Sequence, residues 1–159
     1  MDVRLADRPG DVGEVVALHG RLYADEHGLD ASFEGYVALG LGEWRTAPPA
    51  GPGRLWVADA DGRVTGCIGL TGDSPEVGRL RWFLVDASAR GSGLGRALFD
   101  VALGFAREAG YARIVLETFS ELAGAAHLYR AAGFELAASW TGPLWGRDDL
   151  VRERYELAL

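Results

Sequence analysis

The spacing of hydrophobic residues predicts two helices near the start of the chain. Apolar side chains recur every three or four residues from residue 12 to about residue 23, and again from residue 33 to residue 41. A short strand candidate at residues 3–5 precedes them. Asp11 and Asp30 stand where helix N-caps are expected, because a carboxylate there accepts a hydrogen bond from the first turn.

Beyond a loop rich in proline and glycine at residues 47–53, the hydrophobic period changes to two, which predicts strands. Residues 54–58 and 63–71 flank Asp61-Gly62, a dipeptide typical of a tight hairpin turn. Residues 78–85 are expected to form a third strand. In it, Arg79, Arg81 and Phe83 alternate with the more apolar positions Leu80, Trp82 and Leu84.

The second half of the chain alternates between helical and extended patterns. Residues 93–109 carry a helical apolar stripe that ends before Gly110. A buried strand, a short helix and two final strand candidates follow at residues 114–116, 123–132, 134–140 and 151–159. The strand–helix–strand unit from residue 80 to residue 116 implies a right-handed parallel crossover inside a mixed sheet. The order of elements predicts one α/β (α+β) domain spanning residues 1–159.

Composition and charge narrow the class of protein. Of the 159 residues, 48% are hydrophobic and 25% are charged, which is typical of a soluble globular domain. No window approaches the roughly 20 apolar residues that a membrane span requires, and the first residues lack signal-peptide features. We therefore expect no membrane association. A net charge of −7 argues against general nucleic-acid binding. It either favours a cationic substrate or only keeps the protein soluble.

The single cysteine, Cys67, lies in an apolar run and is expected in the core. It cannot form an internal disulfide, and the three histidines show no metal-ligand spacing with it. We therefore expect no metal and a reducing, cytoplasmic setting.

A glycine-rich turn at residues 90–95 carries the strongest chemical signal. Its sequence, Arg-Gly-Ser-Gly-Leu-Gly, lies between a predicted strand and a predicted helix. The first turn of a helix presents unpaired N–H groups to an anion, and glycine lets the backbone approach closely. Residues 79–96 contain four arginines and a single acid, Asp86, which suits a polyanion. An antiparallel hairpin precedes the turn, which argues against a dinucleotide-binding fold.

The turn, together with a second motif, resembles the GNAT superfamily of acetyltransferases. Arg90-Gly91-x-Gly93-x-Gly95 is similar to the acetyl-CoA motif of that superfamily, and residues 128–134, Leu-Tyr-Arg-Ala-Ala-Gly-Phe, resemble its second motif. The resemblance covers essentially the whole chain. It implies a mixed, mostly antiparallel sheet of six to seven strands with a central splay, flanked by about four helices.

Three segments more narrowly resemble acetyltransferase domains found fused to MarR-type winged-helix regulators: residues 80–85, residues 118–122 and Trp145-Gly146. No winged helix is present in this sequence. The narrower resemblance therefore implies a stand-alone catalytic domain.

The resemblance implies roles for individual residues. The backbone of Phe83, Leu84 and Val85 would contact the pantetheine arm and the thioester carbonyl. Tyr129 would be the general acid that protonates the departing thiolate, although packing beside Leu128 and Phe134 would also explain a tyrosine there. The residues implied to hold the pyrophosphate are Arg90, Gly91, Ser92, Gly93, Leu94, Gly95 and Arg96.

Two features depart from the family pattern. Many relatives carry an asparagine that contacts the cofactor where this chain has Leu122; Thr118 or Ser120 could replace that contact. The frequent glutamate on the strand before the turn is absent. The candidate bases and acceptor-binding groups are Glu26, His27, Glu117 and Glu153, each of which has an alternative as an ordinary surface charge.

The acceptor-binding surface is expected between residues 23 and 44 and around Trp145. The residues that could line it are Phe33, Tyr36, Trp44, Trp140 and Trp145, each of which could equally be a core residue.

These observations predict an acetyl-CoA-dependent N-acetyltransferase. It would move an acetyl group to a primary amine, on a small molecule, by direct attack in a ternary complex, with acetyl-CoA as co-substrate and without metal. The alternative is a non-catalytic acyl-CoA-binding sensor or interaction domain, because the glycine turn would serve either. Dimers are common in enzymes of this type, so a homodimer is also among the expectations.

Overall fold

The structure is a computed structural model that describes residues 2–47 and 49–159. Seven strands form one sheet in the order β1-β2-β3-β4-β5-β7-β6. The strands are β1 (Asp2–Leu5), β2 (Arg54–Ala60), β3 (Arg63–Gly72), β4 (Val77–Val85), β5 (Arg113–Phe119), β6 (Glu135–Thr141) and β7 (Val151–Ala158). The helices are α1 (Asp11–His27), α2 (Ala31–Thr46), the 3₁₀ turn η1 (Ala87–Ala89), α3 (Leu94–Glu108) and α4 (Ala123–Ala131).

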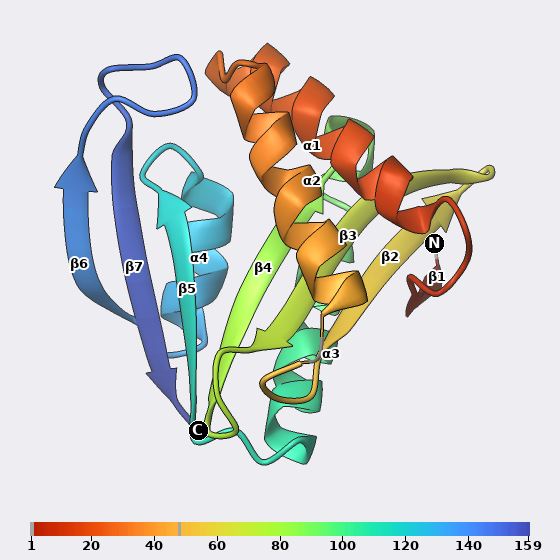
Figure 1. Cartoon of the computed structure of the whole chain (residues 1–159), viewed down its shortest axis with the longest axis vertical. Coiled ribbons are helices and arrows are strands. Elements are labelled where there is room, and N and C mark those ends of the chain that lie inside the picture. The colour runs from red at the N-terminus through yellow and green to blue at the C-terminus, as the bar shows by residue number, and fades with distance from the viewer. Residues whose placement is uncertain (1, 48) are drawn as a thin grey trace.

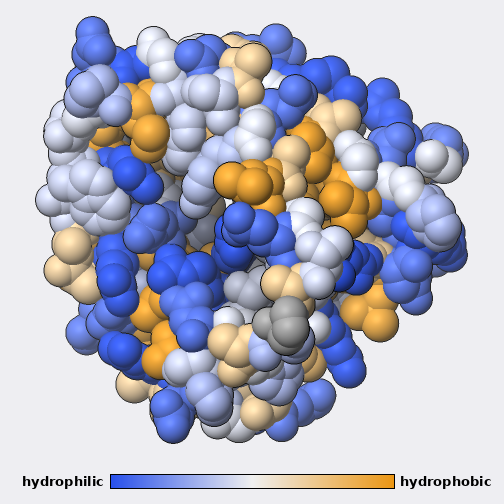
Figure 2. Space-filling view, viewed as in Figure 1, coloured by the Kyte–Doolittle hydropathy of each residue, from blue (hydrophilic) through white to orange (hydrophobic). Residues whose placement is uncertain are grey.

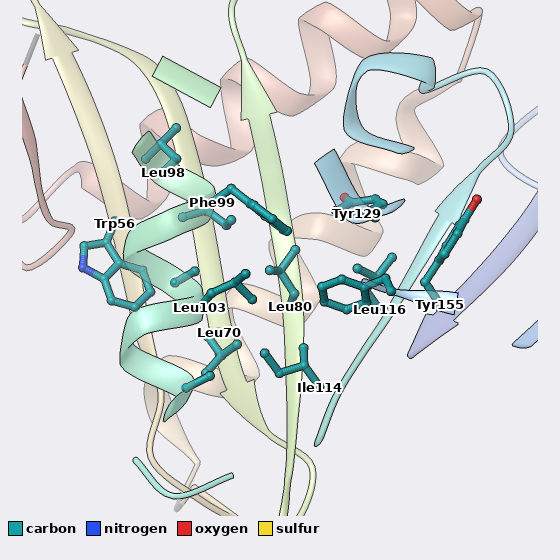
Figure 3. Close-up of a cluster of buried hydrophobic side chains, with 14 of the residues drawn as sticks. Trp56, Leu70, Leu80, Leu98, Phe99, Leu103, Ile114, Leu116, Tyr129 and Tyr155 are labelled. Atoms are coloured by element: carbon teal, nitrogen blue, oxygen red, sulfur yellow. The ribbon is translucent and has the colours of Figure 1, made fainter. Parts of the chain in front are cut away.

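The helices cover both faces of the sheet (Figure 1). One buried cluster joins α1 and α2 to β2, β3 and β4, and a second joins α3 and α4 to the opposite face and to β5 and β7. Figure 3 shows part of the second cluster, with Leu80 of β4 between Phe99 of α3 on one side and Leu116 and Tyr129 on the other. No described helix is both long and apolar enough to cross a membrane.

The predicted fold class is confirmed: the sheet is mixed and mostly antiparallel, and four α-helices flank it. Its one parallel pair, β4 with β5, joins only Val77–Arg79 to Arg113–Val115. Beyond these pairs the two strands diverge, so a gap opens between β4 and β5 toward the end of the molecule that carries the loop between β6 and β7 (Figure 1). This is the predicted central splay.

Two local predictions, a helix cap and a hairpin turn, are confirmed. The Asp30 carboxylate caps α2 by accepting a hydrogen bond from Ser32 N at 2.9 Å, as predicted. Asp61 and Gly62 both have positive φ, as expected for the tight hairpin turn. The loop at residues 47–53 joins α2 to β2, although Pro48 lies outside the described residues.

The prediction that Asp11 caps the first helix is wrong. The N-cap is Gly10, without a side-chain hydrogen bond, and Asp11 is the first helical residue. Its buried carboxylate instead accepts hydrogen bonds from the Arg4 guanidinium at 2.8 and 2.9 Å and from Arg8 N. A charge-assisted, bidentate pair with β1 is stronger than a cap bond, so the aspartate serves the tertiary contact.

The first helix is also longer than predicted, because it continues past Tyr23 to His27. Gly28, with φ of 67°, ends it in the left-handed conformation. As a result Glu26 and His27, which follow the predicted end of the first helix, lie in the last turn of α1.

The strict alternation predicted for the third long strand is interrupted by a β-bulge in β4. Arg81 pairs with Gly69 and Leu84 pairs with Cys67, so two residues of β4, Trp82 and Phe83, oppose a single residue of β3. Trp82 has φ of 52°. Because of the bulge, Leu80 faces α3 while Trp82 and Leu84 face α1 and α2.

Candidate active site at the splay of the sheet

Two cavities meet where β4 and β5 diverge. The glycine-turn cavity, of about 360 Å³, is bordered by the end of β4, the turn before α3, the last turn of α1 and the start of α4. The aromatic cavity, of about 130 Å³, lies between α1, α2, β4, β5 and the loop between β6 and β7. Tyr23, Phe83 and Leu122 line both cavities. Figure 2 shows hydrophilic side chains around a recess near the middle of this face.

The glycine-turn cavity contains most of the residues predicted to contact a cofactor. The predicted residues that line it are Phe83, Leu84, Val85, Arg90, Gly91 and Gly95. The others support the turn or lie beside it. Gly93 is the N-cap of α3, and the buried Leu94 anchors the first turn in the core. The Ser92 hydroxyl donates to Ala89 O at 2.5 Å, and the exposed Arg96 pairs with Asp100 at 3.2 Å.

Glycine is needed at two positions of this turn. Gly91 and Gly93 have φ of 77° and 87°, a conformation that L side chains rarely adopt, and a Cβ atom at either would meet nothing within 4 Å. The positive φ values therefore, rather than a lack of space, require glycine. The turn delivers the chain into α3, whose first N–H groups lack intrahelical partners and carry the positive end of the helix dipole. The site is suited to a phosphate.

Glu26 and His27 border this cavity rather than the aromatic one. The Glu26 carboxylate pairs with the Arg90 guanidinium at 2.8 Å. His27 Nδ1 lies 3.3 Å from the Glu121 carboxylate, and Arg147 pairs with the same carboxylate at 2.6 Å. These hydrogen bonds from Arg147 and His27 hold the pKa of Glu121 below its ordinary value. Two groups of paired polar side chains, Glu26 with Arg90 and Glu121 with His27 and Arg147, therefore lie at the edge of the glycine-turn cavity.

Tyr129 lies on α4 at the wall of the aromatic cavity. Its ring contacts Phe83, Phe99, Phe134 and Tyr155, with centroids 5.8 to 6.4 Å away. Figure 3 shows it between Leu80 of β4 and Tyr155 of β7. Burial raises the pKa of Tyr129 above its ordinary value, so the phenol keeps its proton at neutral pH. Within the described part of the chain, its hydroxyl has no hydrogen-bond partner, and it can donate to a ligand.

The aromatic cavity also contains two of the residues predicted to bind an acceptor. Glu117 pairs with Arg152 at 3.3 Å and with Arg79 at 3.9 Å. Trp145, with φ of 53°, stacks its ring edge-on against Phe33 at 4.9 Å. Glu153, in contrast, lines neither cavity; it lies in β7 opposite Thr118 and Ser139.

The remaining aromatic candidates divide between the cavity and its surroundings. Phe33 and Tyr36 line the aromatic cavity. Trp44 is partly buried and packs against Trp82, with ring centroids 5.9 Å apart. Trp140 lies on the exposed strand β6, where the Arg152 guanidinium covers its ring at 5.0 Å.

His19 is a functional candidate that the sequence interpretation missed. It is only 2% exposed and lines the aromatic cavity. Its Nδ1 lies 2.8 Å from Val15 O, which can only accept a hydrogen bond, so Nδ1 carries the proton and Nε2 the lone pair. Burial lowers the pKa of His19 to about 4, and the ring is therefore neutral at pH 7. The sequence did contain a hint of this burial, because His19 follows Val15 by four residues and therefore lies on the same apolar face of the helix.

Thr118 and Leu122 lie at the junction of the two cavities or next to it. Thr118 Oγ1 is buried and lacks a hydrogen-bond partner within residues 2–47 and 49–159. Leu122 precedes α4 and has a side chain in both cavities. The position of the family's asparagine is thus at the junction, but an apolar group fills it. In the described part of the chain, no cluster of three or more His, Cys, Asp or Glu residues is arranged to hold a metal ion.

Comparison with known proteins identifies the class to which this fold and site belong. Residues 21–134 match the model of the acetyltransferase (GNAT) family, a span that includes the glycine turn and Tyr129. The chain therefore belongs to the GNAT family of acetyltransferases.

Named relatives agree with this assignment. Human N-acetyltransferase 8B is 35% identical over 98 residues, which are 58% of this chain and 43% of that protein. Rat N-acetyltransferase 8B is 39% identical over 86 residues, which are 51% of this chain and 39% of that protein. The chain thus matches less than half the length of these curated relatives.

Solved structures show the same fold. A GNAT acetyltransferase from Staphylococcus aureus superimposes with a TM-score of 0.78 at 18% identity, covering 99% of this chain and 98% of that one. An acetyltransferase from Salmonella typhimurium, solved with its cofactor acetyl-CoA, superimposes with a TM-score of 0.73 at 21% identity, covering 100% and 94%. At such identities the likeness establishes the fold.

Proposed function

We propose that the chain is an acetyl-CoA-dependent N-acetyltransferase in which acetyl-CoA and a primary amine bind together and react directly. One observation carries the proposal: the glycine-turn cavity and the aromatic cavity meet at Tyr23, Phe83 and Leu122, and Tyr129 lies in the wall of the second. This arrangement lets a thioester enter from one side of the splayed sheet and an amine from the other. The reacting groups then need no covalent enzyme intermediate.

In this proposal the first turn of α3 and Arg90 bind the pyrophosphate. The pantetheine arm follows β4 into the gap that β5 leaves open. The amine nitrogen attacks the thioester carbon, and backbone N–H groups near the β4 bulge stabilise the oxyanion. As the carbon–sulfur bond breaks, the Tyr129 phenol donates its proton to the departing thiolate.

The proton on the attacking amine needs an acceptor or a partner within the aromatic cavity. Of the acidic candidates, Glu26 lines the other cavity, Glu153 lines neither, and Glu117 is held by two arginines. His19 is neutral, and Nε2 carries its free lone pair. We assign to it the hydrogen bond that orients the amine for attack. The proton that the nitrogen loses as the amide forms replaces the proton that Tyr129 gives to the departing thiolate, so the phenol is restored.

We further propose that residues 1–159 form a single domain, that the acceptor is a small molecule and that the protein acts as a homodimer in the cytoplasm. We also propose that the chain is related to the acetyltransferase domains fused to MarR-type regulators. The sensor alternative also stands as a second candidate, favoured by Leu122 at the position of the family's asparagine.

Incubation of the protein with acetyl-CoA and a panel of amines, with free CoA followed by a thiol reagent, tests the proposed function. We expect CoA release that depends on the amine and falls in a Tyr129→Phe variant. Tight binding of acetyl-CoA without turnover on any amine would establish the sensor instead.

A further inference from the structure

Arg81 lies in the aromatic cavity on the strand residue directly before the β4 bulge. Its guanidinium stacks over the Trp82 ring, with Cζ 4.3 Å from the ring centroid. Gly40 of α2 leaves room for it, because a Cβ atom at that position would lie 2.5 Å from Nη2. The bulge and the glycine together place a cation between the sheet and α2, where the chain would ordinarily bury apolar groups.

The other arginines that line the aromatic cavity with Arg81 are paired with carboxylates. Arg79 binds the Asp73 carboxylate through Nε at 3.0 Å and Nη2 at 2.8 Å. Arg152 and Arg79 share the Glu117 carboxylate. Asp73 and Glu43 act on Arg81 only at longer range. Within the described residues, Arg81 has neither an ion pair nor a hydrogen bond.

A partly buried arginine without a carboxylate partner is uncommon, because removing a charge from water is costly unless another group compensates for it. Desolvation is the main effect on Arg81 and lowers its pKa, but a guanidinium retains its charge at neutral pH. The stacking on Trp82 offsets part of the penalty. The five donors of the guanidinium remain available, and they match a carboxylate bidentately.

We propose that Arg81 binds a carboxylate of the acetyl acceptor, which makes the acceptor an amino acid with an apolar or aromatic side chain. This inference rests on the proposed function and names its substrate class. The amine would meet the thioester near Phe83, two residues along β4 from Arg81, or about 7 Å of strand. Phe33, Tyr36 and Trp145 would contact the side chain of the acceptor.

The net charge of the whole chain would favour a cationic substrate, in contrast to the anionic group proposed here. A net charge of −7 suggested a cationic substrate, whereas the aromatic cavity is lined by three arginines and one glutamate. Local charge determines which ligand a cavity accepts, because interactions between exposed charges farther than about 10 Å are screened. Of the acidic residues, Glu117 lines the cavity and is held by Arg79 and Arg152, and Asp73 is paired with Arg79.

The test uses three matched acceptors: L-phenylalanine, L-phenylalanine amide and phenethylamine. They share the aromatic group and the primary amine, and only the first carries a carboxylate. We expect kcat/KM to be at least tenfold higher for L-phenylalanine than for the other two, as a charge-assisted hydrogen bond predicts. The same comparison with leucine, its amide and isoamylamine extends it to an aliphatic side chain.

Arg81→Gln should remove this preference by lowering kcat/KM for the amino acid tenfold or more while leaving the amide within about twofold. Gly40→Ala supplies a second variant that keeps the charge but displaces the guanidinium, and we expect a partial loss. Arg107→Gln, an exposed change at the end of α3, is the control and should behave as wild type. Circular dichroism melts verify folding of each variant.

A binding measurement gives a readout that needs no turnover. Calorimetry in the presence of CoA would compare two product analogues, N-acetyl-L-phenylalanine and N-acetylphenethylamine. Turnover of all three acceptors at equal rates would overturn the Arg81 inference and leave acetyl transfer intact. Absence of turnover on every amine would overturn the proposed function. In that case, equal binding of the two N-acetyl compounds would also overturn the carboxylate site, whereas preferential binding that Arg81→Gln abolishes would retain it.

Discussion

The carboxylate of Glu26 and the guanidinium of Arg90 form an ion pair, with 2.8 Å between Oε1 and Nη1, that joins the last turn of α1 to the glycine turn. A second contact, from Nη2 to Oε2 at 2.9 Å, makes the pair bidentate. In a pyrophosphate site, Arg90 would have to exchange this carboxylate for a phosphate. In the proposed pyrophosphate site Glu26 would therefore compete with the ligand, a role that differs from the catalytic one predicted from the sequence.

Replacing Glu26 with glutamine separates these two roles. We expect acetyl-CoA to bind about two- to fivefold more tightly, because Arg90 is released from a pair worth about 0.2–1 kcal/mol, while kcat stays near the wild-type value. Calorimetry gives the dissociation constant, and the CoA-release assay gives kcat. Glu108→Gln is the control, because it also removes one negative charge but at an exposed position in α3. A hundredfold fall in kcat with unchanged affinity would instead establish Glu26 as a catalytic base.

Tyr129→Phe should lower kcat by about a hundredfold or more, which is the usual contribution of a positioned general acid. The loss should leave folding stability nearly unchanged, since no hydrogen bond of this hydroxyl is described. Tyr155→Phe is a matched control, because its ring lies 5.8 Å from that of Tyr129. It removes the hydrogen bond from Arg130 Nη2, at 3.0 Å, and should lower stability by about 1 kcal/mol without loss of activity. Equal effects of the two changes on kcat would exclude a specific role for Tyr129.

The glycine turn shows why part of the site could be predicted from the sequence. An anion site at a helix N-terminus depends on consecutive residues, so Arg90, Gly91 and Gly95 reveal it locally. The helix periods and the Asp61-Gly62 hairpin are local in the same way. The order of the elements then determined the fold class, because a strand–helix–strand crossover leaves few arrangements of the sheet.

The acceptor side could not be predicted in this way, because it depends on contacts between distant residues. Gly69 of β3 pairs with Arg81, directly before the β4 bulge, and this pairing between strands places Arg81 and Trp82 beside the aromatic cavity. Similarly, Asp11 stands at a sequence position typical of a helix N-cap, but the arginine that binds its carboxylate lies in β1. A tertiary ion pair overrides the local preference in such a case.

The buried His19 predicts a specific dependence of stability on pH. Its folded-state pKa of about 4 lies below the ordinary value of 6.5, so the unfolded chain binds the proton more readily. Its contribution to stability is therefore complete above pH 6.5 and is lost as the pH falls toward 4. Between pH 7 and pH 5, this one group should lower the free energy of unfolding by about 2 kcal/mol.

Urea denaturation at the two pH values, for the wild type and for His19→Gln, isolates the effect from that of the carboxylates. The variant has no titrating group at this position, so its stability should fall by about 2 kcal/mol less than that of the wild type. An identical fall in both proteins would mean that His19 keeps its ordinary pKa, and the assignment of a neutral ring in the aromatic cavity would fail.

Gly69 of β3 pairs with Arg81 and lies against the Trp82 side chain of the β4 bulge. A Cβ atom there would lie 2.5 Å from Trp82 Cε3, part of a rigid indole, and 3.4 Å from Arg81 O. Gly69→Ala must therefore displace the bulge, and we expect it to lower the free energy of unfolding by about 1–3 kcal/mol.

Because the bulge is the proposed oxyanion site, kcat of Gly69→Ala should fall at least tenfold. The dissociation constant of CoA, which is set at the distant glycine turn, should change less than threefold. Gly104→Ala in α3 is the control, since its Cβ would meet nothing within 4 Å and alanine favours the helix by up to about 1 kcal/mol. Full activity in a Gly69→Ala protein that is as stable as the wild type would show that catalysis does not depend on the geometry of the bulge.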